Sequence, residues 1–123
     1  MADDLLHVAA GPLMSQATVF NGIAWLSGQI GAGGPHDSFE DECRAALAKV
    51  DGLLAQVGSH RGALLHVTVH IRDLGLMARF NPVWIVWLDG AVPPARVAVQ
   101  TPMVDSAYCV AVSCIARTDA PSG

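Results

Sequence analysis

The segment Leu64–Arg72 constrains the fold most, because its side chains alternate between two kinds along the chain. One set is apolar and the other is polar: Leu65, Val67, Val69 and Ile71 against His66, Thr68, His70 and Arg72. Successive side chains of a strand point to opposite faces of a sheet. The pattern therefore predicts a strand whose apolar face packs on helices. Its mixed polar face must meet solvent, another sheet or a neighbouring subunit.

Turn and capping signals predict the other elements. Asn21-Gly22 between two apolar runs predicts a hairpin, since both residues accept the positive φ of a type I′ turn. Ser38 as N-cap and Gly58 as C-terminal stop bound a helix with one apolar stripe. A second helix is expected to open at Asn81-Pro82 and to run to about Asp89. The remaining predicted strands are Leu5–Val8, Ala95–Thr101 and Ala107–Arg117.

This order, β-ββ-α-β-α-β-β, predicts an α+β fold: a mixed sheet with both helices on one face. A length of 123 residues suits one domain covering 1–123. Residues 118–123 are expected to form a loose tail.

The composition points to assembly. Apolar residues make up 52% of the chain and charged residues only 15%, which is high for a monomer of this size. The longest apolar run, Val83–Leu88, is far too short to span a bilayer. The second predicted helix is apolar nearly all round, which indicates that it is covered on both sides. We therefore expect an oligomer.

Charge and cysteine content exclude other classes. A net charge of -4 does not suit a protein that neutralises phosphates, so nucleic acid is not expected as a partner. Met1–Asp4 lacks a signal pattern, so a cytoplasmic protein is expected. Cys43, Cys109 and Cys114 show no CxxC spacing, which predicts reduced thiols and no metal site.

Short motifs then recur in a specific order along nearly the whole chain. They are Gly11-Pro12, Ser15-Gln16-Ala17, Ser27-Gly28-Gln29, Thr68-Val69-His70-Ile71-Arg72-Asp73-Leu74, Phe80-Asn81 and Pro94-Ala95-Arg96. In this order and spacing they resemble the RidA (YjgF-type) family. The resemblance implies a chorismate-mutase-like fold, a homotrimer and pockets between neighbouring subunits. It also implies a cofactor-free hydrolysis of reactive enamines or imines to a keto acid and ammonia.

The resemblance assigns roles to several residues. Arg96 corresponds to the arginine that holds the substrate carboxylate, a task that suits the guanidinium fork. Backbone groups near Gly28 and on the strand at Ala98 would orient the ligand, with Asn81 as a further pocket residue or simply an N-cap. The family's water-positioning glutamate falls on Ala111, and the last strand holds no carboxylate. The tyrosine that often follows the early Gly-Pro is also missing.

Three residues are candidates to replace the glutamate. Cys109 and Ser113 share the face of Ala111 by two-residue alternation, and His70 titrates near neutrality. Each also has a purely structural interpretation, as a small residue or a hydrogen-bonded histidine packed at a subunit seam. Three functions stay open: a deaminase with altered catalysis, a fold reassigned to another biosynthetic intermediate, and a non-catalytic ligand-binding trimer.

Overall fold

The computed structural model describes residues 4–33 and 36–118. Six strands and two helices follow one another in the predicted order, β1 (Leu6–Val8), β2 (Ala17–Phe20), β3 (Ile23–Gln29), α1 (Phe39–Gln56), β4 (Leu64–Ile71), α2 (Met77–Leu88), β5 (Ala95–Gln100) and β6 (Val110–Arg117). Two short 3₁₀ turns, η1 (Arg61–Ala63) and η2 (Leu74–Leu76), precede β4 and α2. The predicted element order is confirmed.

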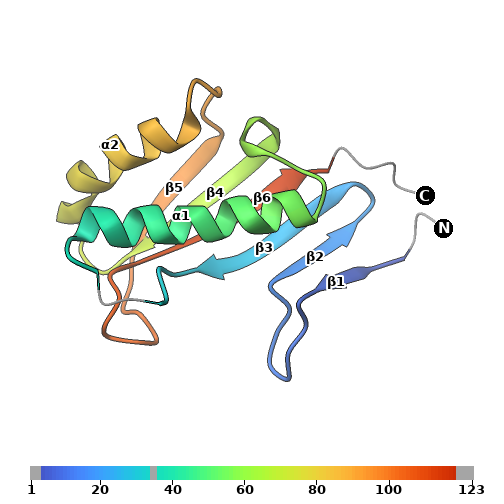
Figure 1. Ribbon diagram of the computed structural model, residues 1–123, viewed down its shortest axis with the longest axis horizontal. Helices are drawn as coiled ribbons and strands as arrows, with labels where there is room; N and C mark the ends of the chain where they lie inside the picture. The colour runs from blue at the N-terminus through green and yellow to red at the C-terminus, as the bar shows by residue number, and fades with distance from the viewer. Residues whose placement is uncertain (1–3, 34–35, 119–123) are drawn as a thin grey trace.

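The strands form one mixed sheet in the order β1-β2-β3-β6-β4-β5 (Figure 1). Only β4 and β5 are parallel; the other neighbours are antiparallel. The β2–β3 hairpin turns at Asn21 and Gly22, with φ angles of 51° and 77°. These are the positive values that the Asn-Gly pair predicts. β5 is an edge strand, so one side of its backbone is open to pairing.

Both helices cover the same face of the sheet, as expected (Figure 1). The Ser38 side chain accepts a hydrogen bond from the Asp41 N–H at 3.1 Å and so caps α1. Gly58, with φ of 74°, ends the helix. The apolar stripe of α1 is buried against the sheet, and its fully covered residues include Cys43, Leu47 and Val50.

β4 differs from its predicted alternation at one end. Leu65 is 46% exposed, whereas Leu64 is buried. The register with β6 shifts between Leu64 and His66, and this irregularity turns the Leu65 side chain away from the core. Beyond it the prediction holds, because Val67, Val69 and Ile71 are all buried.

The prediction that α2 opens at Asn81 is wrong. The helix begins at Met77, directly after η2, which Asp73 caps by accepting the Gly75 N–H at 2.8 Å. Pro82 therefore lies inside the helix, where it lacks the N–H that would bond to the carbonyl four residues earlier, in the exposed first turn. Burial of the Phe80 side chain explains the early start, since it anchors that turn on the core.

α2 is covered on one side only. Phe80, Val83, Trp84 and Leu88 are buried, whereas the intervening Ile85 and Val86 are 67% and 78% exposed. The expectation of cover on both sides is therefore not met within one chain. No helix among the described residues is long and apolar enough to cross a membrane.

The last two strands are shorter than predicted. β5 ends at Gln100, and β6 begins at Val110. Residues 101–109 form a loop, because Arg72 and Glu42 take up its backbone groups in place of a neighbouring strand. Cys109 thus precedes β6. At the other end Thr118 is buried and donates its N–H to the Gly22 carbonyl at 2.8 Å, so it is not part of a loose tail. The rest of that predicted tail, like Met1–Asp3, lies outside the described residues.

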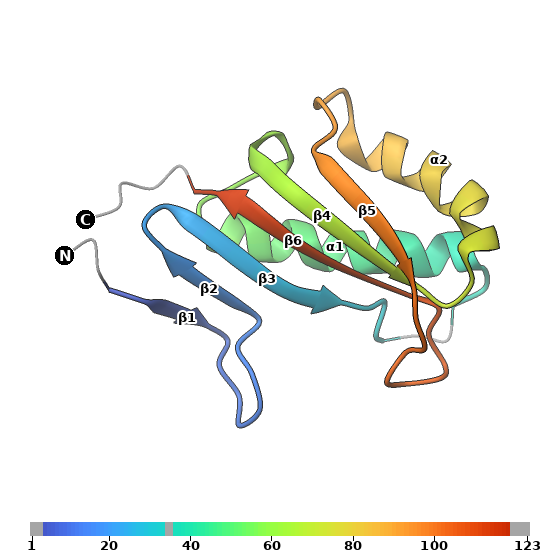
Figure 2. The same cartoon turned by 180° about the vertical axis from the view of Figure 1, so that it is seen from behind.

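No helix of residues 4–33 and 36–118 covers the second face of the sheet (Figure 2). It presents the polar residues of β4 together with apolar ones from its neighbours. Trp25, Val97 and Val99 are each more than 40% exposed there. We call this surface the open face.

Candidate functional site

A cavity of about 460 Å³ lies at one end of the open face. The end of β3, strand β4, the start of β6 and the loop 101–109 surround it. Its lining consists of Gly28, Ile30, His70, Thr101, Pro102, Met103, Val104, Asp105, Tyr108 and Ala111. The volume is in the range of small-molecule sites.

The floor of this cavity is made by small residues. A Cβ placed on Gly28 would lie 3.7 Å from the Ala111 Cβ, an ordinary contact distance. Gly28 sits where the β3–β6 register shifts, between Leu26 and Gln29. Two neighbouring strands thus bring small residues together at one point, and the cavity is open above them.

His70 places a titratable group in this cavity. Its Nε2 lies 3.1 Å from the Ser113 Oγ, within hydrogen-bonding distance. The contact fixes the imidazole ring on the open face, beside Ala111, its partner in the β4–β6 register. The ring is thus held in a fixed position at the cavity.

The loop 101–109 is anchored from both sides of the sheet. The Arg72 guanidinium donates to the carbonyl of Tyr108 at 2.7 Å and to that of Ser106. The buried Glu42 carboxylate accepts the N–H groups of Cys109 and Val110 at 2.7 and 3.1 Å. These charge-assisted bonds hold Tyr108 at the cavity.

Sequence reasoning missed these loop residues and their anchors. Glu42 is an acidic residue in the first turn of α1, a position that the helix dipole alone would explain. A signal was available, because Glu42 falls three residues after Phe39 and four before Ala46, on the apolar side of α1. A charged residue in such a stripe needs a partner. Nothing in the sequence pattern indicates that Tyr108 and Asp105 line the cavity.

Arg96 lies on the other side of the sheet. In the parallel register it pairs with the buried Val67, whereas His70 pairs with Val99. Its guanidinium carbon lies 5.4 Å from the Trp84 ring centre and 5.9 Å from that of Phe80 on α2. Partial removal from water lowers the pKa of the Arg96 guanidinium from its ordinary value. Within the described chain, no carboxylate is paired with this cation.

Asn81 also lies on the helix side. The Oδ1 atom of this side chain is shielded from solvent, and no described residue donates a hydrogen bond to it. Buried amide oxygens are nearly always paired. Ala98 follows Arg96 on the same face and packs against the hydrophobic core.

The predicted site residues thus separate into two groups. Gly28, His70 and Ala111 meet at the cavity, with Ser113 bonded to His70. Arg96, Asn81 and Ala98 lie across the sheet, and none of them lines the cavity. Cys109 adjoins the cavity through Tyr108 but is not part of its lining.

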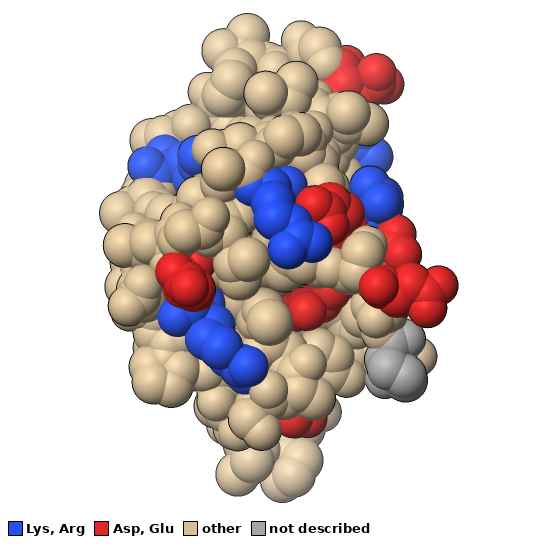
Figure 3. All heavy atoms as spheres, turned by 90° about the vertical axis from the view of Figure 1, so that its left-hand side faces the viewer, with Lys and Arg blue, Asp and Glu red and all other residues tan. Residues whose placement is uncertain are grey.

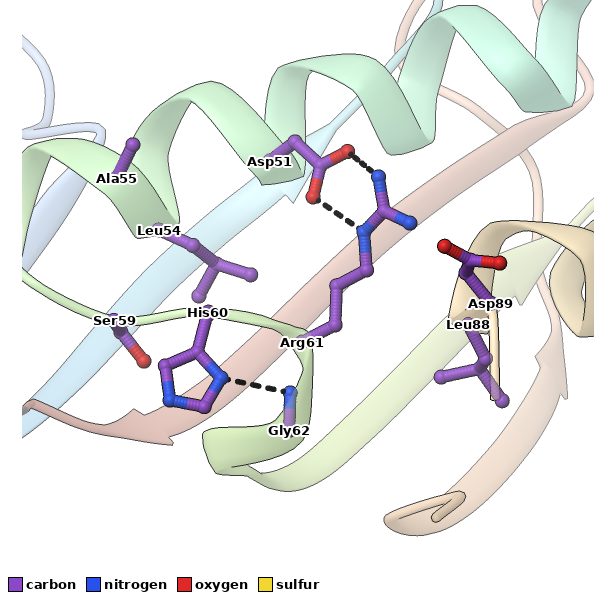
Figure 4. Close-up of a pocket in the computed structure, with 9 residues that line it drawn as sticks. All are labelled: Asp51, Leu54, Ala55, Ser59, His60, Arg61, Gly62, Leu88 and Asp89. Atoms are coloured by element: carbon purple, nitrogen blue, oxygen red, sulfur yellow. Dashed lines mark hydrogen bonds and ion pairs between the residues drawn. The ribbon is translucent and has the colours of Figure 1, made fainter. Parts of the chain in front are cut away.

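A second cavity of about 440 Å³ lies between the ends of the two helices (Figure 4). Its polar groups are largely satisfied by one another. Asp51 accepts two hydrogen bonds from Arg61, at 2.9 and 2.7 Å, and one from the Trp87 ring N–H at 3.0 Å. Arg61 in turn donates to the Trp87 carbonyl. This network joins the ends of the two helices. A structural role therefore explains these polar residues, and no ligand is needed to explain them.

Two of the three thiols are unreactive, and the described residues contain no cluster that could form a metal centre. Burial raises the pKa of Cys43 and that of Cys114 to about 12, so both stay protonated. No group of three or more His, Cys, Asp or Glu in residues 4–33 and 36–118 lies together in a way that could hold a metal ion.

Comparison with known proteins decides the family. The model of the family described as "Endoribonuclease L-PSP" matches residues 7–118. The chain belongs to this RidA/YjgF family.

Relatives of this RidA/YjgF chain support the assignment. A RutC family protein of Haemophilus influenzae is 26% identical over 103 residues, 84% of this chain and 89% of that protein. One from Aquifex aeolicus is 33% identical over 97 residues, 75% and 77% of the two chains.

Solved structures of the family share the fold. A YjgF-family protein from Neisseria meningitidis has a TM-score of 0.91 at 26% identity, with 98% of this chain and 100% of that chain covered. Escherichia coli TdcF with bound serine has a TM-score of 0.80 at 26% identity, covering 90% and 91%. The predicted α+β fold with two helices on one face is confirmed.

Proposed function

We propose that the chain is a RidA-family hydrolase that converts a small enamine or imine carboxylate to a keto acid and ammonia. The observation that carries the proposal is the division of the site. A histidine with a hydroxyl partner faces a cavity on one side of the sheet. An arginine that has no carboxylate partner among the described residues lies at the β5 edge, on the other side of the sheet.

The proposal requires more than one copy. Arg96 and the cavity belong to opposite faces, so a carboxylate held by Arg96 meets His70 of a neighbouring subunit. A homotrimer in the cytoplasm is the proposed form, because family members are generally oligomers that bind small molecules. The apolar side chains of the open face, Trp25, Val97 and Val99, suit burial between copies.

Arg96 would recognise the substrate carboxylate. The serine bound to TdcF carries such a group, which supports an amino-acid-like ligand here. The rings of Phe80 and Trp84 hold the guanidinium at the β5 edge through cation–π contacts.

His70 would act as the proton acceptor in place of the family's glutamate. In the tautomer whose Nε2–H donates to the Ser113 Oγ, Nδ1 is free to accept a proton from water as the water oxygen bonds to the carbon of the protonated imine. That proton then passes to the carbinolamine nitrogen. The C–N bond breaks, the hydroxyl proton returns to Nδ1 as the carbonyl forms, and the ammonia released takes it up as ammonium. A positioned proton acceptor contributes roughly 10²–10⁴-fold to such a rate.

The test is hydrolysis of 2-aminoacrylate generated in situ, with the buffer rate subtracted. We expect turnover by the natural chain, and a loss of roughly 10²-fold or more in His70→Asn. Arg96→Lys should mainly raise KM, since an ammonium group cannot form the bidentate contact. Val86→Ala, on the exposed side of α2, serves as the control for handling and folding.

A second function is favoured by one observation, the absence of a carboxylate at Ala111 and Ser113 of β6. The pocket would then bind a related intermediate for a different reaction, or bind it without turnover. If the natural chain matches buffer while Ala111→Glu gains activity, deamination is not its own function. Ligand binding retained in that case would support this second candidate.

RNA cleavage, the activity in the family's name, is not part of the proposed function. The face that carries the beginnings of α1 and α2 shows acidic and basic side chains interspersed (Figure 3). Arg79 is paired with Glu40 and Arg44 with Asp41 in this region. Such paired charges do not offer the basic surface that phosphates require.

A further inference from the structure

The cavity on the open face contains no cation of its own. None of its lining residues is Lys or Arg, so the lining offers a carboxylate no permanent positive charge. Under the proposed function, on which this inference rests, the carboxylate belongs to Arg96 of the neighbouring copy. What the cavity receives is therefore the remainder of the substrate.

The walls of the cavity are suited to apolar groups. Ile30, Pro102 and Met103 contribute hydrocarbon or thioether surface around it. Met103 is half-buried, and its flexible, polarisable side chain adapts to groups of different shape.

The floor leaves room where a longer side chain would fill it. Gly28 has no side chain and Ala111 has only a methyl group. The carboxylate at this position in the wider family would make the floor charged and less deep. Here the floor is neutral and its side chains are short. The carboxylate of Asp105 in the lining already accepts the Ala107 N–H at 2.9 Å, so hydrocarbon can be buried above the floor without leaving that charge unpaired.

The walls are also held in place. Glu42 and Arg72 bind the backbone at one end of loop 101–109, and the Thr101 N–H donates to the Ile71 carbonyl at 2.9 Å at the other. These contacts fix both ends of the loop that carries Pro102 and Met103.

We infer that the preferred substrates are imino acids with an apolar side chain of about four or more heavy atoms, such as those derived from leucine, methionine or phenylalanine. The smallest substrate of this type, the enamine or imine of pyruvate, leaves the walls and floor uncontacted. Gly28 and Ala111 are then specificity-determining residues, and the step itself is the hydrolysis described above.

The experiment compares imines produced by a broad-specificity amino-acid oxidase from alanine, leucine, methionine and phenylalanine. The rate of imine loss is measured with and without the protein. Each methylene group in a fitting apolar site changes kcat/KM by roughly 10- to 200-fold. We expect the leucine- and methionine-derived imines to exceed the alanine-derived imine by at least about 10-fold.

Ala111→Leu fills the floor and should lower kcat/KM for the leucine- and methionine-derived imines more than for the alanine-derived imine, so that the preference for the larger substrates is lost. Val86→Ala, on the far side of the molecule, should keep the natural order. Equal rates for all imines, or a preference for the smallest, would overturn the inference while the proposed hydrolase function stands.

Binding separates the two proposals if no imine is turned over. That result would defeat the hydrolase function but leave the cavity's preference measurable by calorimetry with keto acids. Tighter binding of 4-methyl-2-oxopentanoate than of pyruvate, lost in Ala111→Leu, would support the inference. Equal affinities for the two keto acids would overturn it.

Discussion

Two of the three cysteines differ sharply from the third in their surroundings. Cys43 and Cys114 lie in the core, where burial raises the pKa of each thiol to about 12. Cys109 is only half-buried, at the end of the loop. The thiolate is the reactive form, so a neutral disulfide reagent at pH 8 should modify at most Cys109 in the native protein.

Cys109→Ser provides the control for this prediction. It should abolish the native reaction, and all remaining thiols should react only after unfolding in denaturant. Rapid modification of Cys43 or Cys114 in the native Cys109→Ser protein would contradict their burial.

Individual residues show where sequence reasoning works and where it stops. The sequence identifies Arg96, Gly28 and His70 as candidates, because their residue types suit carboxylate binding, close approach and proton transfer. It does not predict that they lie on two different faces of the sheet. The side on which Arg96 lies depends on the register between β5 and β4. The prediction that Leu65 is buried was wrong for a similar reason. A local irregularity in the β4–β6 register breaks the two-residue alternation, and the sequence carries no signal for it.

At the scale of elements, Asp51 joins three segments of chain. Its carboxylate binds Arg61 of η1 and the Trp87 indole of α2 from its own position on α1. Asp51→Ala should lower the free energy of unfolding by about 1–2 kcal/mol, a modest value because the ion pair is partly exposed to water.

Denaturant titration followed by tryptophan fluorescence measures this loss. Asp89→Asn is the matched control, because Asp89 has a left-handed backbone that asparagine tolerates. That variant removes a nearby charge without removing a hydrogen bond to Trp87, and it should change stability little. Equal effects of the two substitutions would show that charge alone, and not the three-way contact, matters.

The beginnings of the two helices are joined by Glu40 and Arg79. Hydrogen bonds from Arg79 lower the pKa of Glu40 from 4.5 to about 2. A depressed carboxyl pKa stabilises the folded state above the unfolded-state value and loses that effect as pH falls toward the folded-state value. Glu40→Gln should therefore be less stable than the natural chain at pH 7.

The difference between these two proteins should shrink below pH 4.5 and vanish near pH 2, measured by urea titration across that range. The same comparison at pH 7 in about 1 M salt should also show a smaller difference, because exposed charges are screened. If the difference in stability stayed constant with pH, it would arise from packing and not from the charge of Glu40.

The order of elements could be predicted because each has its own local signal: an Asn-Gly turn, a serine cap, an alternating strand. Boundaries set by tertiary contacts could not. α2 begins early because Phe80 is drawn into the core, and Asn81-Pro82, a good opening signal, lies past the start. β6 begins late because Arg72 and Glu42 take up backbone groups of the preceding loop.

At the scale of the whole molecule, the proposed site can be tested by mixing subunits. Arg96→Ala and His70→Asn chains should each be inactive as pure assemblies. In mixed assemblies, some seams join an intact Arg96 of one copy to an intact His70 of the next. Random mixing in equal amounts should restore about one quarter of the natural activity.

The double variant Arg96→Ala/His70→Asn, mixed with either single variant, is the control and should restore nothing. A mass three times that of one chain, measured by light scattering, should accompany the restored activity. Absence of any restoration in assemblies shown to contain both chains would place the two groups in the same copy.

One feature of the sheet has a wider physiological consequence. Under the proposed function, an isolated polypeptide is complete as a fold and incomplete as a catalyst, since the arginine and the histidine lie on opposite faces of the sheet. Turnover per chain should then decline on dilution, as assemblies come apart. A cell that made too little of this protein would contain well-folded molecules and almost no working sites.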